Sequence, residues 1–474
     1  MKKLFKILII ALMILATSVA LFGCIEPGEE GDTPTDIPTD GGTENGGNEG
    51  EGSGGDNTTP PTTTPDNDGV SGSDSLFVFE LNEARDGVIL TSVNVKEPVV
   101  VIPDSFQEKP VKEIAEGVFH ANQILEEVVI PASVERIGAR AFSSSYSLKK
   151  VTIKENSSLK FIGYRAFYNA EYLESINLPE GLVEIEGGAF ELCVTLSNLT
   201  LPSTLSKIGA KALHSAWFDA QEEGLIVVNN VAYAYKAGED VASLTIPSTI
   251  ASIADEAFYG NSKISAIYIP HSVTSIGSKA LCNLPELLTI GVSVENEVYS
   301  SEGNCLMEKA TSKLLASTKS TIIPASVKIV GEEAFAYNVA IGEITLPSTV
   351  ESIEKGAFKC SGITKITLPD GLKVIEEDLF LDAEKLTSVN IPSSVEEIRR
   401  ASFNGCLSLE EVIIDSGEIL ALCIGKLNSP AGLMAYAKVV YVNENVEESS
   451  DYLTAFFEEK TSDKAGYKKY VINP

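Results

Sequence analysis

The stretch IPASVERIGARAF, residues 130–142, contains a pattern that the rest of the chain repeats. Clear further copies are IPSTIASIADEAF (residues 246–258), LPSTVESIEKGAF (residues 346–358) and IPSSVEEIRRASF (residues 391–403). Eleven copies follow one another with a period of about 23 residues. A fixed period of this length is the sequence signature of a solenoid, in which each copy forms one turn.

The last apolar residue of each copy gives the register of the repeat. Successive steps are mostly 22, 23 or 25 residues, and two longer steps of 45 and 54 residues indicate copies that carry an insertion or a degenerate repeat. One copy of this size cannot bury enough apolar surface to offset its chain entropy, so each copy must stack on its neighbours. The register residues are Phe119, Phe142, Phe167, Phe190, Leu213, Phe258, Leu281, Phe335, Phe358, Phe380 and Phe403.

Each copy offers two short β-type runs separated by a proline, such as residues 173–178 and 182–185 around Pro179. Proline ends the first strand and turns the chain. We expect the A-F segment to form a short helical turn on the outer side. We also expect a glycine one or two residues after the second run to adopt positive φ there. These glycines are Gly138, Gly163, Gly187, Gly209 and Gly277.

Alternation along the first run points its apolar residues inward and leaves one residue per copy outward. This outward column is the candidate partner-binding surface, although threonine is favoured on exposed strand positions for its propensity alone. Its members are Thr152, Asn177, Thr200, Thr245, Tyr268, Thr345, Thr367 and Asn390.

The I-P-x-S-V-x-x-I and A-F elements, over roughly residues 101–414, resemble the BspA-type leucine-rich repeats of bacterial surface proteins. The resemblance implies a right-handed, elongated, β-rich solenoid of the α/β repeat class with short helical turns. It also implies a role on the bacterial cell surface in adhesion or protein binding.

The N-terminus predicts export. MKKLFK is basic, residues 7–22 are apolar and Gly23-Cys24 follows at once, so residues 1–23 are typical of a signal peptide. The string L-F-G-C resembles a bacterial lipobox, which implies lipid attachment at Cys24. The alternative is that residues 7–22 remain as an uncleaved anchor. In both cases we expect a membrane-tethered protein that faces outward.

Residues 24–74 differ in composition from the repeats. Positions 26–74 contain 13 Asp or Glu and no Lys or Arg, and they are rich in Gly, Thr, Pro and Asn, so we expect a disordered acidic tether. Of the formal net charge of -31, the leader contributes +3 and the tether -13, which leaves -21 on residues 75–474. A field of this sign disfavours nucleic acids as partners.

We expect residues 75–110 to cap the solenoid of residues 111–414, and residues 415–474 to cap its other end with a strand at 438–442 and a helix near 447–459. Two stretches within the solenoid, 224–247 and 300–324, read as hairpin variants. Their aromatic neighbours Trp217 and Tyr235 are candidate binding residues, with packing against the neighbouring repeats as the alternative.

No residue pattern predicts catalysis, a metal site or a cofactor. The sequence lacks C-x-x-C, H-E-x-x-H, G-x-S-x-G and phosphate-binding glycine motifs. We expect Cys193, Cys360 and Cys406 to be small buried residues, whereas Cys282, Cys305 and Cys423 lie off the repeat register. Three histidines, His120, His214 and His271, are expected to be solvated turn residues.

The sequence therefore favours an adhesin-like, non-catalytic surface lipoprotein, monomeric, that binds a host or microbial surface protein. The alternative is a carbohydrate-binding surface lipoprotein that captures glycans for neighbouring machinery. Tyrosines at positions 164, 168 and 172 support this alternative, because glycan sites favour exposed aromatic platforms.

Overall fold

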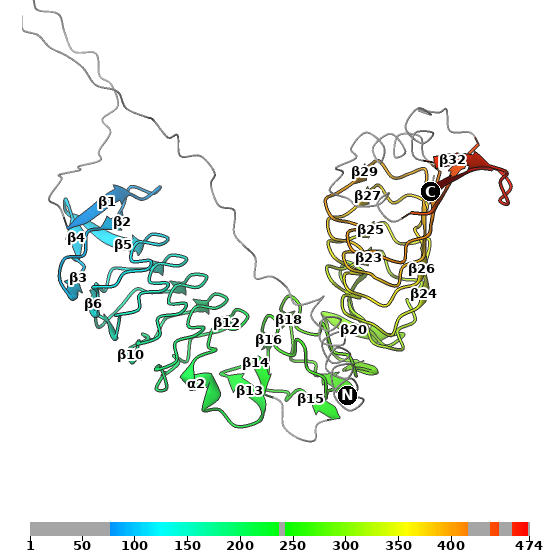
Figure 1. Ribbon diagram of the computed structural model, residues 1–474. Helices are drawn as coiled ribbons and strands as arrows, with labels where there is room; N and C mark the ends of the chain where they lie inside the picture. The colour runs from blue at the N-terminus through cyan, green and yellow to red at the C-terminus, as the bar shows by residue number, and fades with distance from the viewer. Residues whose placement is uncertain (1–75, 237–241, 416–436, 445–456, 473–474) are drawn as a thin grey trace, which may run out of the picture. The chain divides into compact units, whose positions relative to one another are not determined.

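The computed structural model describes residues 76–236, 242–415, 437–444 and 457–472. These residues form a β-solenoid whose successive turns follow one another in chain order (Figure 1). Each regular turn contributes one strand to each of two parallel ladders, as the two β-type runs of the repeat predict. The first ladder contains the strand before the repeat proline, and the second ladder contains the strand after it.

Four of the sheets make up the N-terminal and central turns. An eight-stranded sheet has the order β1-β2-β5-β7-β9-β11-β12 with β4 paired to β5, and a four-stranded sheet has the order β10-β8-β6-β3. Their strands are β1 (Phe77–Leu81), β2 (Val88–Val93), β3 (Val99–Val101), β4 (Ser105–Phe106), β5 (Lys109–Ile114), β6 (Glu127–Ile130), β7 (Arg136–Ile137), β8 (Lys150–Ile153), β9 (Phe161–Ile162), β10 (Ser175–Ile176), β11 (Glu184–Ile185) and β12 (Lys207–Ile208). The two central sheets, β13-β14-β16-β18 and β15-β17-β19, contain β13 (Gly224–Val228), β14 (Val231–Lys236), β15 (Ser243–Thr245), β16 (Ser252–Ile253), β17 (Ala266–Ile269), β18 (Ser275–Ile276) and β19 (Thr289–Val292).

The remaining three sheets follow the orders β20-β21-β22-β23-β25, β24-β26-β28-β30-β31-β33-β32 and β27-β29. Their strands are β20 (Tyr299–Glu302), β21 (Cys305–Glu308), β22 (Lys313–Ala316), β23 (Ile329–Val330), β24 (Glu343–Thr345), β25 (Ser352–Ile353), β26 (Lys365–Thr367), β27 (Val374–Ile375), β28 (Ser388–Ile391), β29 (Glu397–Ile398), β30 (Glu411–Ile414), β31 (Val439–Asn443), β32 (Phe457–Lys460) and β33 (Tyr467–Ile472). Residues 457–459 therefore belong to strand β32 and not to the predicted helix, whose other residues lie outside the described ranges. Antiparallel pairing of β31 with β33 extends the first ladder instead.

The aromatic register residues stack on one another in the core, as predicted. Phe119, Phe142, Phe167 and Phe190 are buried, and their ring centroids follow at 4.7, 5.0 and 5.2 Å with interplanar angles of at most 7°. A second stack joins Phe335 to Phe403 at 5.1 to 5.6 Å. Leucine replaces phenylalanine at the last register position before each inserted hairpin.

The A-F segment forms a tight turn and not a helical turn, because left-handed residues interrupt it. Arg140 and Ser144 on either side of Ala141-Phe142 have φ values of 53° and 55°, and the corresponding pair around Phe167 has φ values of 52° and 58°. A right-handed helix cannot continue through such residues. Among the described residues, the helical content is one four-residue helix, α2 (Ala216–Asp219).

The glycines after the second strand serve a different purpose from the predicted one. Gly138, Gly163, Gly187, Gly209 and Gly277 do not have positive φ. Instead, a Cβ on Gly138 would lie 2.8 Å from backbone atoms of the preceding turn, and one on Gly209 would lie 2.4 Å from the nitrogen of Gly187. Glycine is needed because successive turns approach too closely there for a side chain.

In several of the described turns, the Ser/Thr two residues after the repeat proline links the turn to the one before. The hydroxyl of Ser133 donates to the carbonyl oxygen of Val111 at 2.8 Å, and that of Thr204 donates to Leu182 at the same distance. Thr349 and Ser394 repeat this contact in the C-terminal turns. The hydroxyl therefore satisfies a backbone acceptor that the turn would otherwise leave without a partner.

The inserted hairpins, β13–β14 and β20–β21, replace this contact with asparagine and tyrosine. The amide of Asn229 donates to the carbonyls of Pro202 and Leu205, and that of Asn296 donates to Pro270 and Val273. Close by, a buried tyrosine hydroxyl accepts a backbone N–H of the preceding turn: Tyr233 accepts from Leu213 at 2.8 Å, and Tyr299 from Ile276 at 3.0 Å. The two hairpins thus join the stack by the same set of bonds.

The buried side chains form two main clusters that meet at the second hairpin. One cluster extends from Phe79 to Ala316 and the other from Cys305 to Tyr470. Alternate residues of strand β21 face different clusters, because Leu306 belongs to the first whereas Cys305 and Met307 belong to the second. This hairpin is therefore the partition between two cores.

Candidate functional site

The outward column lies on the exposed side of the first ladder, but three separate sheets carry it. Thr245 aligns with Tyr268 between β15 and β17, and Thr345, Thr367 and Asn390 align across β24, β26 and β28. Thr152 on β8 aligns with Val129 on β6. Thr200 is exposed outside any strand, and Thr152 and Asn390 are half-buried. The inserted hairpins therefore divide the predicted column into three parts.

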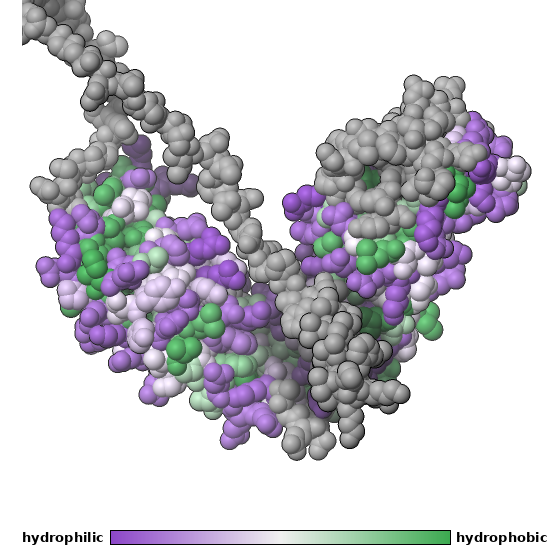
Figure 2. All heavy atoms as spheres, in the orientation of Figure 1, coloured by the Kyte–Doolittle hydropathy of each residue, from purple (hydrophilic) through white to green (hydrophobic). Residues whose placement is uncertain are grey.

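The same register positions include residues that the sequence analysis did not select. Val101 is 54 % exposed and aligns with Val129, and Gly291, Ile413 and the buried Tyr441 continue the register in the later sheets. The β-branched members Val101, Val129 and Ile413 were not predicted to face outward, because a β-branched residue in a strand usually indicates a core position. Figure 2 shows hydrophilic and hydrophobic residues interspersed in small groups over the visible face.

Two members of the column have structural contacts of their own. The side chain of Asn177 bridges the backbone of the preceding turn, because its Oδ1 accepts from the nitrogen of Ile153 and its Nδ2 donates to the oxygen of Ile153, both at 2.8 Å. Tyr268 is 46 % exposed, and its ring covers Gly291, where a Cβ would lie 2.6 Å from the ring. Both side chains are nevertheless exposed.

The aromatic residues near the first hairpin pack against the solenoid. Trp217 and Tyr235 are half-buried and contact the first core cluster, so the packing alternative accounts for most of their surface. Ser215 caps helix α2 by accepting from the nitrogen of Trp217. The geometry leaves only a part of each ring for a partner.

His214 is not the solvated turn residue that was expected. It is half-buried and stacks on Phe218 with centroids 4.1 Å apart, and its Nδ1 lies 3.1 Å from the hydroxyl of Tyr233. Burial, helped by nearby Lys211, lowers the pKa of His214 to about 4, so the ring is neutral at neutral pH. Because the Tyr233 hydroxyl accepts from Leu213, its own proton is available to Nδ1. His120 and His271 are exposed as expected.

The tyrosines that favoured a glycan platform form a different arrangement. Tyr164 and Tyr168 are half-buried, and the guanidinium carbon of Arg165 lies 5.0 Å and 4.8 Å from their ring centroids. Tyr172 is 54 % exposed. An arginine side chain therefore occupies ring surface that a sugar would need, and Tyr172 remains as the open ring of the three.

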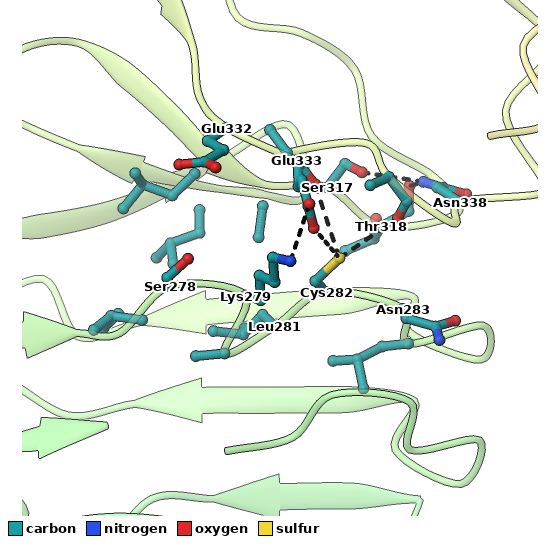
Figure 3. A pocket seen from close by; sticks show the side chains of 18 of the residues that line it. Ser278, Lys279, Leu281, Cys282, Asn283, Ser317, Thr318, Glu332, Glu333 and Asn338 are labelled. Atoms are coloured by element: carbon teal, nitrogen blue, oxygen red, sulfur yellow. Dashed lines mark hydrogen bonds and ion pairs between the residues drawn. The ribbon is translucent and has the colours of Figure 1, made fainter. Parts of the chain in front are cut away.

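A cavity of about 230 Å³ lies beside the second hairpin, where both ladders are interrupted (Figure 3). Lys279 and Glu333 form an ion pair of 3.2 Å in it, and the Cys282 thiol lies 3.8 Å from the Glu333 carboxylate. Asn338 donates to Ser317 and to the carbonyl of Thr318. The central polar groups thus bind one another. Burial raises the pKa of the Cys282 thiol, so it is not a nucleophilic thiolate at neutral pH.

The other cysteines are structural. Five cysteines are buried: Cys193, Cys282, Cys305, Cys360 and Cys406. The thiols of Cys193 and Cys406 contact the carbonyls of Phe167 and Phe380 in the preceding turn, where Ser145 makes the equivalent bond to Phe119. Burial raises the pKa of both thiols to about 12. Cys24 and Cys423 lie outside the described residues.

The described ranges contain neither a metal-binding group nor a membrane-spanning helix. Histidine, cysteine and carboxylate side chains do not gather there into a group of three or more that could hold a metal ion. The same residues contain no helix of the length and apolar character required to cross a bilayer.

Solved structures of several bacterial proteins are similar to this chain. A leucine rich cell surface protein of Faecalibacterium prausnitzii is 27 % identical, with a TM-score of 0.42, over 73 % of this chain and 88 % of that one. The pneumococcal vaccine antigen PcpA is 20 % identical, with a TM-score of 0.37, over 73 % and 81 %. A leucine-rich repeat protein of Eubacterium ventriosum is 20 % identical, with a TM-score of 0.35, over 73 % and 78 %.

No curated protein matches the chain. The family described as BspA type leucine rich repeat region matches residues 103–217, 230–314 and 312–421, in six copies. These ranges contain the Phe stacks, the interturn Ser/Thr bonds and the close glycine contacts described above, and they cover more than half of the chain. The protein therefore belongs to the BspA-type leucine-rich repeat family.

Proposed function

We propose that this protein is a non-catalytic binding module, displayed outside the bacterial cell and tethered through lipid on Cys24, that attaches to a protein on another surface. The observation that carries the proposal is the outward column, whose exposed side chains are fixed in register by hydrogen-bonded ladders. Thr245 and Tyr268, for example, are aligned partners on adjacent parallel strands and are both exposed. A wide surface that is ordered before binding loses little conformational entropy on association.

Surface display is supported by the family and by the N-terminal sequence. BspA-type repeats are typical of bacterial surface proteins, and a basic, apolar leader precedes Gly23-Cys24. Replacing Cys24 with serine should abolish incorporation of labelled fatty acid into the chain. Cys193→Ser is the matched control, because that buried thiol can be replaced by a hydroxyl at the same place. Equal labelling of both variants would contradict lipid attachment at Cys24.

A pull-down tests the binding function directly. Full-length chain serves as bait against extracts of host and microbial surface proteins, and we expect a specific protein to be retained. The double variant Thr245→Lys/Tyr268→Lys should retain at least tenfold less of it, because two large cations are placed in the proposed contact. Ser248→Lys/Ser262→Lys is the control, since both serines are exposed in the same turns but off the column.

Three results would count against the proposal in different ways. Equal retention by the double variant and its control would exclude Thr245 and Tyr268 from the contact. Capture of no protein by the unaltered chain would contradict protein binding. Binding to neutral glycans on an array, without binding to proteins, would favour glycan capture, for which the exposed ring of Tyr172 is the supporting observation.

A further inference from the structure

Arg165 is held between two aromatic rings on the turn that follows strand β9. Its guanidinium lies against Tyr164 and Tyr168, at the distances given above, and its own φ is 52°. The neighbouring Asn169 donates its amide to the hydroxyl of Tyr146, which is 40 % exposed. We call these five residues the Arg165 cluster. Stacking on two rings restricts the rotamers of the arginine and so orders its donors before any partner arrives.

Arg165 is unusual among the basic residues at its position in the repeat. Arg140 pairs with Glu116 at 3.5 Å and Lys211 pairs with Glu256 at 3.9 Å, whereas Lys279 forms the ion pair with Glu333. Across the described part of the chain, the side chain of Arg165 has no hydrogen-bond or ion-pair partner. In the next turn, Gly188 occupies the equivalent position and cannot supply one. Five N–H donors of a half-buried guanidinium are thus left for an external acceptor.

Carboxylates surround the Arg165 cluster without pairing with the guanidinium. Glu186 accepts from the backbone nitrogen of Tyr164 at 2.7 Å, and Glu116 is paired with Arg140. Glu191 extends to the same side of Gly188 as Arg165: a Cβ on that glycine would lie 3.1 Å from Oε2 of Glu191 and 3.7 Å from Nε of Arg165. Arg140, whose guanidinium carbon lies 5.9 Å from the Tyr164 ring centroid, is paired with Glu116. Among the described residues, Arg165 is therefore the cation of this surface that has no ion-pair partner, and Glu186 and Glu191 flank it.

We propose that the Arg165 cluster binds an Asp or Glu side chain that a partner protein presents within an otherwise basic surface. The planar guanidinium matches a carboxylate in bidentate geometry, and tyrosine and arginine are the residues that most often dominate binding energy at protein interfaces. The basic surroundings of the partner carboxylate face the glutamates that flank Arg165. A polyuronate, by contrast, places repeated negative charge against those glutamates and against a chain of net charge -31. The inference rests on the proposed protein-binding function and specifies its chemistry.

Two short peptides separate the carboxylate from general electrostatic attraction. The probes are acetyl-Lys-Lys-Asp-Lys-Lys-amide and its Asn counterpart, passed over immobilised full-length chain in a surface plasmon resonance experiment. The Asp peptide carries less positive charge, so an acidic surface alone would prefer the Asn peptide. We expect the reverse, with at least tenfold tighter binding of the Asp peptide. Equal binding, preference for the Asn peptide or binding of neither would overturn the proposal.

Three variants assign the effect to named residues. Arg165→Lys keeps the charge but removes the planar fork, so it should abolish the preference for Asp. Glu191→Gln removes the closest competing carboxylate and should tighten Asp-peptide binding severalfold. Arg85→Lys is the control, because Arg85 is an exposed turn arginine remote in sequence from the cluster. A thermal midpoint measured for each variant checks that the solenoid remains folded. An Arg165→Lys variant that keeps the preference while folded would refute the assignment.

Polygalacturonate in the same experiment tests the competing class of ligand. Tighter binding of this polymer than of the Asp peptide would overturn the choice of a protein partner. The pull-down distinguishes failure of the inference about Arg165 from failure of the proposed protein-binding function. If the unaltered chain and Arg165→Lys capture the same protein equally, the inference about Arg165 fails while protein binding stands. If neither captures a protein, protein binding itself fails.

Discussion

At the scale of single residues, the glycines after the second strand set how closely the turns can approach. At Gly209 an added Cβ would lie 2.4 Å from the nitrogen of Gly187 and 2.9 Å from neighbouring backbone atoms. Backbone cannot move aside as the end of a flexible side chain can, so a methyl group there must push two turns apart. Stacking of Phe190 and the residues around it depends on that spacing.

We therefore predict that Gly209→Ala lowers the free energy of unfolding by about 2 kcal/mol or more, as overpacking of a rigid site does. Chemical denaturation followed by circular dichroism measures the change. Gly342→Ala is the control, since its φ is not positive and an added Cβ would meet nothing nearer than 3.9 Å. Similar losses in both variants would show that close approach is not what selects glycine at position 209.

The residue scale also shows what a repeat sequence can and cannot predict. The Phe stack could be predicted because a fixed period places equivalent residues over one another. The glycines were interpreted wrongly because positive φ and close backbone approach both select glycine, and the sequence does not distinguish them. The left-handed positions instead carry residues such as Arg140, Glu256 and Ala401, whose side chains give no signal of that conformation.

At the scale of elements, each inserted hairpin depends on one asparagine. Asn296 is buried, donates to Pro270 and Val273, and accepts from the nitrogens of Val298 and Tyr299 at 3.0 and 2.7 Å. It thus satisfies backbone groups on both the hairpin and the turn before it. Loss of a partner leaves each such group buried without a hydrogen bond, at a cost of about 1 to 3 kcal/mol.

Asn296→Ala should accordingly lower the free energy of unfolding by about 3 kcal/mol. Tyr299→Phe should cost less, about 1 to 2 kcal/mol, because it removes only the acceptor for the nitrogen of Ile276. Asn198→Ala, at an exposed site, is the control and should change stability little. Thermal or urea unfolding of the three variants measures the order of their stability losses. A loss in Asn296→Ala no greater than in the control would contradict the role of the asparagine.

The first hairpin should make stability depend on pH through His214. Its pKa is about 4 in the folded protein, against an ordinary value of 6.5. Below pH 6.5 the unfolded chain therefore binds more protons than the folded one, and stability falls as pH falls toward 4. Between pH 7 and pH 5 the loss is about 1 to 2 kcal/mol. His214→Gln should lack this component. If the stability of the unaltered protein and that of His214→Gln changed with pH in the same way, the prediction would be contradicted.

Contacts that depend on how the inserted hairpins pack could not be predicted from the sequence. The hydroxyl of Tyr233 reaches the ring of His214 only because the inserted hairpin folds back onto the preceding turn. Nothing in the local sequence of either residue indicates that contact. The division of the outward column has the same origin, since the sequence predicts the hairpin between Thr200 and Thr245 but not that it interrupts the column. Arg165 was not selected because its lack of a partner is a property of the neighbouring turns.

At the scale of the whole described solenoid, the partition at the second hairpin, β20–β21, should make unfolding a two-step process. The two core clusters contact opposite faces of strand β21, and both parallel ladders are interrupted beside this hairpin. Phe142→Leu, in the first cluster, and Phe358→Leu, in the second, are equivalent changes in the repeat. Each should accelerate hydrogen exchange mainly in its own cluster, as measured by mass spectrometry along a urea series. Equal acceleration in both clusters would indicate one cooperative core.

The hydroxyl bonds from Ser133 to Val111 and from Thr204 to Leu182 reach back by 22 residues, which is one turn. In these copies the hydroxyl donor belongs to one copy and the carbonyl acceptor to the copy before it, whereas a copy such as the one that contains Gly181 has no hydroxyl at this position. Because the acceptor is a backbone carbonyl, which every copy has, excising or duplicating one whole copy within residues 111–209 leaves an acceptor for each of these hydroxyls. A gene encoding such a chain can change the number of copies by recombination, and the length of the displayed surface changes without redesign of the core.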